Sequence, residues 1–330
     1  FIELGILSAY KNKGLFKTNN ISIFELKLLV MFKGINAIEF TKRFKSDADC
    51  FEYLLQLKWP AGFSCSRCGC TKAIKGRTWH HKRCGECRYD ENVLANTVFH
   101  GVKMPLLKAF HMMFRLTAKK KGMSTVELGH EVGVQQKTAW LFKRKVQQMM
   151  KEDDDDEIGG NADVDEFLLG GYSEGKRGRS LEDKQAVLIV AEQLEDGRTG
   201  KIGLKHIENF EADTLGCAIE QITNPQAHLR ADSYSSYKCL QQTMNLEIVK
   251  SEKGSALAQL HKQIMLFKNW LRGIHHKCSK EHLHAYLKEY VFRFNRRNKR
   301  KYLFHEMMHR MMNSFPHPYK YLINKCGCYA

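Results

Sequence analysis

Residues 161–172 read NADVDEFLLGGY, and this stretch decides how the second half of the chain is interpreted. Apolar residues before a Gly-Gly pair are typical of a strand that ends in a turn. Because side chains along a strand alternate between its two faces, Asp163 and Asp165 share one face and Glu166 takes the other. A buried strand face disfavours carboxylates. These acids therefore need a chemical explanation.

The chain continues with further strand-like runs after this stretch. They read QAVLIVAEQ (185–193), GKIGLKHIE (200–208), AHLRADSY (227–234) and LEIVKS (246–251), with a helical pattern at Ala212–Ile222 and long helices at the end. Three strands in succession, followed by strands that alternate with helices, indicate a mixed α/β sheet.

The length and net charge of the chain indicate its number of domains and its expected binding partner. The chain has 330 residues, enough for about two domains of ordinary size. Lys and Arg outnumber Asp and Glu by 53 to 36, which gives a net charge of +17. A chain this basic is expected to bind a polyanion, with nucleic acid as the first interpretation and a membrane surface as the second.

No segment predicts membrane insertion or secretion. No run approaches the roughly 18 apolar residues of a membrane span, and no signal peptide is evident. The chain begins with Phe1 rather than Met, so we expect a translated fragment in which Met31 is the natural start.

Four of the eleven cysteines form a metal-binding pattern. Cys65, Cys68, Cys84 and Cys87 give C-x2-C-x15-C-x2-C, in which each pair brings two thiolates to one side of a tight turn. Two such pairs complete a tetrahedral zinc site whose ligands all come from the protein, so the zinc would fold a ribbon and not catalyse. Redox-active or unrelated cysteines are the alternative, and Cys70 is an extra thiol.

The remaining cysteines are scattered and the total is odd, which fits a reducing compartment better than a disulfide framework. Basic residues surround the four-cysteine pattern and suit contact with phosphates. They are Arg67, Lys72, Lys75, Arg77, Lys82, Arg83 and Arg88.

The segment KGMSTVELGHEVGVQQKTAWLFKRKVQQMM (121–150) predicts a helix-turn-helix. Ser124 or Thr125 is the expected N-cap of the first helix, and Gly133 supplies the turn. The second helix would lie in a DNA major groove. The residues that would read bases near its start are Gln135, Gln136 and Lys137. An ordinary helical hairpin is the alternative, but the basic cysteine module beside it favours DNA binding.

A second acid that would share a site with Asp165 is Asp232, which follows a short strand-like run in LRADSYSSY. Two aspartates on adjacent strands form a site for Mg²⁺, which prefers carboxylate oxygens. Two such ions about 3.5–4 Å apart activate a nucleophile and stabilise the leaving oxygen in phosphodiester chemistry. Each aspartate alone would be read as a strand-end or turn residue, so the pair is informative because the chain also carries DNA-binding features.

A third ligand is expected from a later helix, and His261 is the candidate. Lys268 follows seven residues on, and seven residues make about two helical turns, so both side chains share one helix face. His261 would bind the metal while Lys268 reaches a DNA phosphate. The alternative is an ordinary pair of surface side chains.

Together these residues resemble the ISXO-type insertion-sequence transposases from about Met31 to Arg300. The resemblance rests on CFEYLLQLKWPAGFSCSRCG, the second C-x-x-C, NTVFHGVKMPLLKAF, VGVQQKTAW, VDEFLLGG, ADSYSSY, LRGIHHKCSKEHLHAYL and VFRFNRR. It implies a ribonuclease-H-like mixed sheet with helices, preceded by a zinc ribbon. It also implies divalent metal, Mg or Mn, and cut-and-paste movement of the element's own double-stranded DNA. Joining two element ends implies a homo-oligomer.

The same resemblance assigns roles to individual residues. Asp165 matches the first catalytic acid and Asp232 the second. Some members have Glu where this chain has His261. The subgroup that this chain resembles most has His there, together with an Asn where this chain has Leu266. Either His261 completes the site without that Asn, or this copy has lost a catalytic residue.

The leading prediction is a DNA transposase that binds element ends and catalyses metal-dependent strand cleavage and transfer. An inactive or domesticated transposase that only binds DNA is the alternative from a different class, and a nuclease of the same fold is a third. The expected location is cytoplasmic and nucleoid-associated, with no membrane partner.

The predicted organisation has seven parts. They are an extension of unknown role (1–30), a helical segment (31–60) with a helical pattern at Asn36–Trp59, the zinc ribbon (61–95), the helix-turn-helix region (96–150), an acidic linker (151–160), the catalytic domain (161–300) and a C-terminal tail (301–330).

Overall fold

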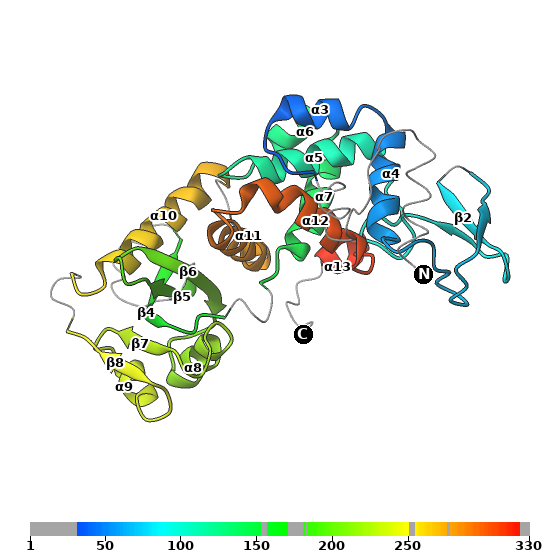
Figure 1. The fold of residues 1–330 in the computed structure, drawn as a ribbon. Helices are drawn as coiled ribbons and strands as arrows, with labels where there is room; N and C mark the ends of the chain where they lie inside the picture. The colour runs from blue at the N-terminus through cyan, green and yellow to red at the C-terminus, as the bar shows by residue number, and fades with distance from the viewer. Residues whose placement is uncertain are drawn as a thin grey trace. The chain divides into compact units, whose positions relative to one another are not determined.

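The computed structural model describes residues 32–78, 80–152, 157–170, 181, 184–250, 255–275 and 278–323. They form two compact units, one of residues 32–149 and 299–323 and the other of residues 150–298 (Figure 1). The predictions for the extension at 1–30, the start at Met31 and the acidic run at 153–156 fall outside the described residues. None of the described helices has the length and apolar character needed to cross a membrane.

The first unit is mainly helical and is built on a cluster of phenylalanine rings. Its helices are α3 (Ala37–Arg43), α4 (Asp47–Lys58), α5 (Leu106–Ala118), α6 (Thr125–Val132), α7 (Gln136–Met149), α12 (Leu303–Met312) and α13 (Tyr319–Ile323). Phe40 stacks on Phe114 with 4.4 Å between ring centroids and meets Phe304 edge-on at 5.6 Å. All three rings are buried, so this core joins α3, α5 and α12.

Two helices replace the continuous helical pattern expected from Asn36 to Trp59. Helix α3 ends at Arg43, and α4 begins at Asp47 with Ser46 as its N-cap. The Ser46 hydroxyl accepts a hydrogen bond from the backbone N–H of Asp49, and the Asp49 carboxylate accepts one from the backbone N–H of Ser46. This capping box satisfies the free N–H groups of a new helix start, so the chain turns there.

A buried helix, α12, lies where the sequence predicted a C-terminal tail. It packs on α4, α5 and α7 of the first unit. Its buried residues recur every three to four positions, which is the spacing of one helix face: Leu303, Phe304, Met307, Met308 and Met311. The apolar face of α12 therefore belongs to the core of the first unit.

The cysteine region forms a small antiparallel sheet of β1 (Ala73–Lys75), β2 (His81–Cys84) and β3 (Asp90–Asn92), in the order β1-β2-β3. Glu91 of β3 is buried, and its carboxylate forms an ion pair with Lys58 at 2.9 Å and accepts a hydrogen bond from the backbone N–H of Ser66 at 3.1 Å. Strands this short bury little apolar surface, so the sheet depends on such links and on its cysteines.

The second unit carries a five-stranded mixed sheet in the order β6-β5-β4-β7-β8. Its strands are β4 (Asn161–Leu169), β5 (Gln185–Gln193), β6 (Thr199–Ile207), β7 (His228–Ala231) and β8 (Leu246–Ile248). The pairs β4–β5 and β5–β6 are antiparallel, whereas β4–β7 and β7–β8 are parallel. The predicted mixed α/β sheet is confirmed, and it fits the ribonuclease-H-like arrangement that the resemblance implied.

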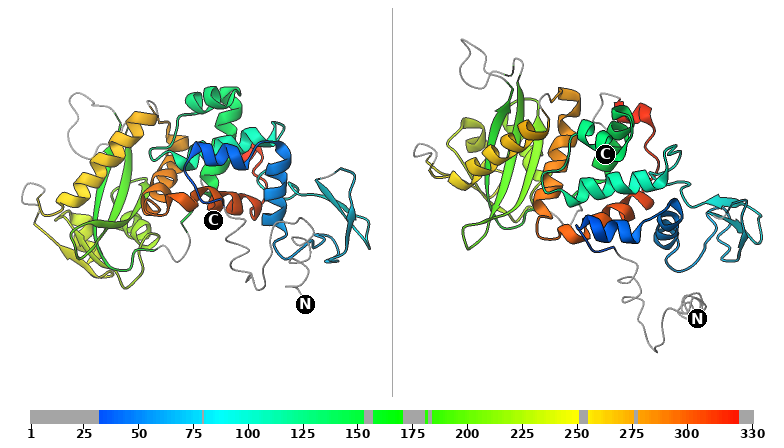
Figure 2. Two further views of the ribbon diagram at one scale, coloured as in Figure 1. Left: turned by 45° about the horizontal axis from the view of Figure 1, so that its top comes forward. Right: turned by 90° about the horizontal axis from the view of Figure 1, so that it is seen from above.

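Helices cover both faces of this sheet (Figure 2). Helices α8 (Ala212–Glu220) and α9 (Ser235–Leu240) share one apolar layer with the sheet, and α10 (Ala258–Ile274) and α11 (Leu283–Asn295) share the other. Val190 of β5 faces the first layer and Ile189 the second, as strand alternation requires. Burial on both sides explains why β5 is an almost continuous apolar run.

Replacing Phe304 with Ala should lower the unfolding free energy of the first unit by about 3–5 kcal/mol, because the ring fills the phenylalanine core. Urea denaturation of the full chain measures the effect. Phe315→Ala is the matched control, since Phe315 is 82% exposed and its loss should change stability by less than about 0.5 kcal/mol. Equal effects of the two substitutions would contradict the placement of α12 in the core.

Candidate functional site

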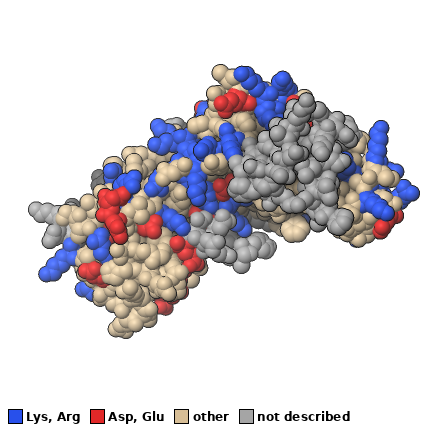
Figure 3. Space-filling model, viewed as in Figure 1, with Lys and Arg blue, Asp and Glu red and all other residues tan. Residues whose placement is uncertain are grey.

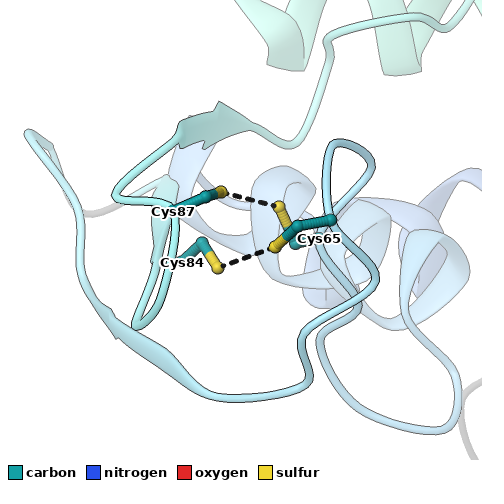
Figure 4. Close-up of side chains that lie close together, drawn as sticks. Cys65, Cys84 and Cys87 are labelled. Carbon is teal, nitrogen blue, oxygen red and sulfur yellow. Dashed lines mark hydrogen bonds between the residues drawn. The ribbon is translucent and has the colours of Figure 1, made fainter.

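Four cysteine thiols converge in the first unit. Their sulfur atoms all lie within 4.8 Å of one another, with 3.6 Å between Cys65 and Cys87 and 3.5 Å between Cys68 and Cys84. Figure 4 shows the thiols of Cys65, Cys84 and Cys87 directed toward a common centre. Sulfurs at tetrahedral corners, each about 2.3 Å from zinc, would be about 3.8 Å apart. The four residues therefore fit a structural zinc ion.

The two cysteine pairs sit on matching backbone turns. The residue after each second cysteine has a positive φ, +72° at Gly69 and +59° at Arg88. The backbone N–H of Cys65 donates to the Cys70 carbonyl, and that of Cys84 donates to the Tyr89 carbonyl. Each turn thus points its two thiols to one side of the backbone. Cys70 is half-buried and is not one of the four converging thiols.

Backbone hydrogen bonds prepare one of these thiols to bind metal. Burial opposes ionisation of Cys84, but the backbone N–H groups of Cys87 and Glu86 donate to its sulfur and lower its pKa to about 6. The thiolate is the form that binds zinc. The turn that carries Cys84 therefore stabilises the charge state that a metal ion requires.

Basic side chains gather over this zinc module, as Figure 3 shows. Five of the seven predicted residues are exposed: Arg67, Lys72, Lys75, Arg77 and Arg88. Arg77 lies near Asp90, with 3.7 Å between its Nε and the carboxylate, so one of these cations is partly neutralised. The module presents a positive surface around the two cysteine turns, which suits contact with a phosphate backbone.

The predicted helix-turn-helix is formed by α6 and α7. Ser124 caps α6 by accepting a hydrogen bond from the backbone N–H of Glu127, and Gly133 ends it with a left-handed φ of +66°. A Cβ at Gly129 would lie 2.9 Å from the Val134 carbonyl oxygen, so the turn needs glycine there for the two helices to approach. Neither Gly129 nor its close contact was foreseen from the sequence.

The residues predicted to read bases are exposed at the start of α7. These are Gln135, Gln136 and Lys137. The second half of the helix differs: Lys143 is buried and donates to the Met123 carbonyl at 2.8 Å, and Lys145 is buried and donates to the Val98 carbonyl at 3.2 Å. The helix therefore offers its first turn to a partner and uses later basic residues to hold the fold.

In the second unit, the two aspartates predicted to bind metal lie on neighbouring strands. The parallel register pairs Asp163 with Arg230 and Val164 with Ala231, so Asp165 and Asp232 follow at the next level. Asp165 lies within β4, and Asp232 comes directly after the end of β7. Asp165 follows the alternation that places Asp163 on the face covered by α10, whereas Asp232 lies just beyond its strand.

Helix α10 brings His261 onto Asp165. The distance between His261 Nε2 and Asp165 Oδ2 is 3.2 Å. Two ligand atoms at adjacent corners of an octahedral ion, each about 2.1 Å from it, would be about 3.0 Å apart. Asp165 and His261 therefore fit one divalent ion. Among the described residues, the thiols are the only set of three or more candidate ligands within 4.8 Å of each other, so the Asp232 carboxylate does not lie within that distance of both Asp165 and His261.

Charge at this site is costly without a cation. Burial raises the pKa of Asp165 to about 6, and the negative charges of Glu166 and Asp232 raise it as well, whereas the backbone N–H of Glu166 and the nearby His261 lower it. A divalent ion would offset both the burial of the Asp165 carboxylate and its repulsion by the neighbouring negative charges.

Lys268 lies on the same side of α10 as His261, two helical turns later. Its Nζ is 5.1 Å from the centre of the Phe167 ring, and Phe167 shares the strand face of Asp165. Burial and the nearby Arg272 lower the pKa of Lys268, whereas the charge of Asp165 raises it. The ammonium group is thus within electrostatic reach of the acids.

The other two acids of β4 have structural partners. Asp163 is buried, and its Oδ1 meets Arg230 Nε at 2.8 Å while its Oδ2 accepts from Gln193 Nε2 at 2.8 Å. Glu166 accepts a hydrogen bond from the Tyr237 hydroxyl at 2.6 Å on the opposite face of the sheet. No local pattern in the sequence identifies Arg230, Gln193 or Tyr237 as partners, because each is distant along the chain.

Comparisons with protein families match both units. Residues 157–295 match the ISXO2-like transposase domain, and residues 45–90 match the transposase zinc-ribbon domain. The chain belongs to the ISXO2-like transposase family. A comparison with curated proteins gave no match. The ISXO2-like domain contains Asp165, Asp232 and His261, and the zinc-ribbon domain contains the four converging cysteines and all of α4.

Loss of one converging thiol should remove zinc from this ISXO2-like protein. Metal analysis of the full chain should find one zinc per molecule in the parent and none in Cys84→Ser. Thermal unfolding should show the first unit destabilised in Cys84→Ser, because zinc-binding energy in such modules is largely folding energy. Cys70→Ser is the matched control and should keep its zinc, since Cys70 lies outside the group of four. Zinc retained by Cys84→Ser would rule the site out.

Asp165→Asn should stabilise the metal-free protein at pH 7. The folded-state pKa of about 6 exceeds the ordinary value of 3.8, so the folded state binds this proton more tightly than the unfolded state. The ionised group therefore destabilises the fold by about 3 kcal/mol at pH 7, and this destabilisation disappears as the pH falls from 6 toward 4.

Urea denaturation in EDTA, from pH 7 to pH 4, measures this difference. The parent and Asp165→Asn should differ most at pH 7 and converge near pH 4. Asp196→Asn is the control, because Asp196 is an exposed residue whose pKa is lowered by hydrogen bonds from Arg198. A gap between parent and variant that stays constant with pH would contradict the assignment.

Proposed function

We propose that this chain is an active DNA transposase that cleaves and joins strands at the ends of its own element. The observation that carries the proposal is the contact of His261 Nε2 with Asp165 Oδ2 at 3.2 Å, inside the ISXO2-like transposase domain that also contains Asp232 directly after β7. The family membership supports the reaction class, and the geometry supports these three residues as the metal ligands.

Each residue has a defined task under this proposal. Divalent ions in such a site activate the attacking oxygen and stabilise the leaving oxygen of a phosphodiester. The carboxylates of Asp165 and Asp232 would hold Mg²⁺ or Mn²⁺, and His261 would supply an imidazole nitrogen from α10. Lys268, two helical turns from His261, would hold a phosphate of the strand being cut.

The first unit would bind double-stranded DNA. The exposed basic residues of the zinc module would follow the phosphate backbone, which makes binding salt-dependent. The exposed side chains at the start of α7, Gln135, Gln136 and Lys137, would enter the major groove and read bases. Joining two element ends requires at least two copies of the catalytic unit, so the active form would be a homo-oligomer in the cytoplasm, associated with the nucleoid.

The rival function, DNA binding without catalysis, rests on Leu266. At about 100° per residue, position 266 lies roughly 140° around α10 from His261, whereas position 268 lies within about 20° of it. Leu266 is exposed, and an Asn there would point away from the imidazole that touches Asp165. The lost Asn therefore does not remove a ligand from the Asp165–His261 pair, which favours the active enzyme over the rival and leaves a simple nuclease as an outcome of the assay.

Purified protein incubated with duplexes carrying the element's terminal repeats and Mn²⁺ should nick and then join the strands. The cleavage rate should fall in each of three variants: Asp165→Asn, Asp232→Asn and His261→Ala. Each fall should exceed the roughly 10–100-fold loss of activity that follows removal of a group that only supports a metal ligand. All three should still bind the duplex. Imidazole suits Mn²⁺ better than Mg²⁺, so the parent should prefer Mn²⁺ and His261→Glu should shift that preference toward Mg²⁺.

Lys137→Ala is the contrasting variant. It should weaken duplex binding while keeping the parental cleavage rate at saturating protein, since Lys137 belongs to the first unit. Cleavage by Asp165→Asn at the parental rate would overturn the metal site. Nicking without strand transfer would point to a nuclease, and binding without nicking by the parent would point to the non-catalytic rival.

A further inference from the structure

A hydrogen bond on the face of the sheet opposite the acids ties together the two segments that carry them. The Tyr237 hydroxyl donates to Glu166 Oε2 at 2.6 Å. Tyr237 of α9 is fully buried in the apolar layer that α8 and α9 share with the sheet, and Glu166 is half-buried. Burial and the charge of Glu166 hold the pKa of Tyr237 well above its ordinary value, so the hydroxyl stays protonated and remains a donor.

Both ends of this bond lie next to a proposed metal ligand. Glu166 follows Asp165 directly on β4, with its side chain on the other face. Tyr237 lies on α9, and the turn leading into α9 contains Asp232, whose Oδ1 accepts a hydrogen bond from the backbone N–H of Tyr234 at 3.1 Å. A continuous path therefore runs from Asp165 through Glu166, Tyr237 and α9 to Asp232.

The ladder of the sheet does not reach Asp232. The pairing of β7 with both of its neighbours ends at Ala231. One residue earlier, Arg230 is fixed by Asp163, but after Ala231 the chain leaves the sheet and enters the turn. The position of the Asp232 carboxylate therefore depends on where α9 sits, and the Tyr237–Glu166 bond is a polar contact that fixes α9 to β4.

Packing alone would not call for this pair. A phenylalanine at 237 would fill the same apolar space, and a carboxylate at 166 adds a negative charge that opposes ionisation of its neighbour Asp165. Burying a hydroxyl and a carboxylate costs the free energy of removing both groups from water. Their hydrogen bond offsets this cost only while its donor–acceptor geometry is kept. Such a pair therefore orients the segments that carry it more than it stabilises the fold.

We propose that Tyr237 and Glu166 are positioning residues that set the Asp232 carboxylate beside Asp165 for metal binding. The inference rests on the proposed function, because it takes Asp165 and Asp232 as the ligands. Neither Tyr237 nor Glu166 touches the metal or the DNA. They act through the turn that holds Asp232.

The test is Mn²⁺ binding to the full, zinc-loaded chain without DNA, measured by electron paramagnetic resonance of free Mn²⁺. Tyr237→Phe removes only the hydroxyl and should weaken Mn²⁺ binding about 10-fold, in the range of losses for groups that orient metal ligands. Glu166→Gln keeps an oxygen acceptor for the hydroxyl and should stay within about 3-fold of the parent, whereas Glu166→Leu should match Tyr237→Phe. The double variant Tyr237→Phe/Glu166→Leu should be no weaker than either single variant, as expected for two ends of one bond.

Cleavage assays should show the same pattern in a second readout. Tyr237→Phe should need about 10-fold more Mn²⁺ for half-maximal cleavage and should recover most of the parental rate at saturating Mn²⁺. Tyr290→Phe is the matched control, because Tyr290 is a buried tyrosine of the other apolar layer, and it should leave Mn²⁺ dependence unchanged.

Several outcomes would overturn the proposal. These are an unchanged Mn²⁺ affinity in Tyr237→Phe, an equal loss in Tyr290→Phe, or a lower melting temperature with no change in Mn²⁺ dependence. If Tyr237→Phe fails to fold, the comparison of Glu166→Gln with Glu166→Leu decides the question by itself. Asp165→Asn separates the two levels of inference: parental Mn²⁺ binding in that variant would refute the metal site and not the positioning bond.

Discussion

The parallel pairing of β4 with β7 is the constraint on which the second unit depends. A register that joins Val164 to Ala231 places Asp165 of β4, on the face that α10 covers, next to the end of β7, where Asp232 follows. Shifting either strand by one residue would turn one aspartate to the opposite layer. The register is held by apolar residues of both layers and by the ion pair of Asp163 with Arg230. The stability that these contacts contribute offsets the cost of keeping two like charges near each other.

The two units treat metal ions in opposite ways. In the first unit, strands of three or four residues bury little surface, and four thiols supply the crosslink that the sheet lacks. In the second unit, two apolar layers form a complete core, so Asp165 is not needed for folding and its charge even opposes it. The four cysteines would fill every ligand position with protein, as structural zinc requires, while the site proposed in the second unit would take two or three protein ligands and leave room for water and substrate.

Local patterns in the sequence predicted the elements, and long-range pairing decided the rest. The spacing of Cys65, Cys68, Cys84 and Cys87, the turn at Gly133 and the apolar runs of β4 and β5 each carry their own signal within a few residues. The capping box at Ser46 is also a local signal, but it lies inside the longer helical pattern from Asn36 to Trp59, which hides it. By contrast, Tyr237 meets Glu166 only because α9 packs under β4, and α12 becomes core only because Phe304 meets rings from α3 and α5. The periodicity of the sequence does not reveal contacts between residues that are far apart along the chain.

Charge gives the proposed reaction an order of events. The chain has a net charge of +17, and basic residues over the zinc module and on α10 attract a polyanion. The proposed site nevertheless holds the carboxylates of Asp165 and Asp232 where a phosphodiester would be cut, and at a few ångströms like charges repel strongly in a half-buried site. Under this proposal, divalent cations held by the aspartates would reverse the sign of that site. An imidazole ligand at His261, in place of a third carboxylate, would leave the loaded site with about one less negative charge. Metal binding would therefore favour the approach of the DNA strand, and the histidine would strengthen that attraction.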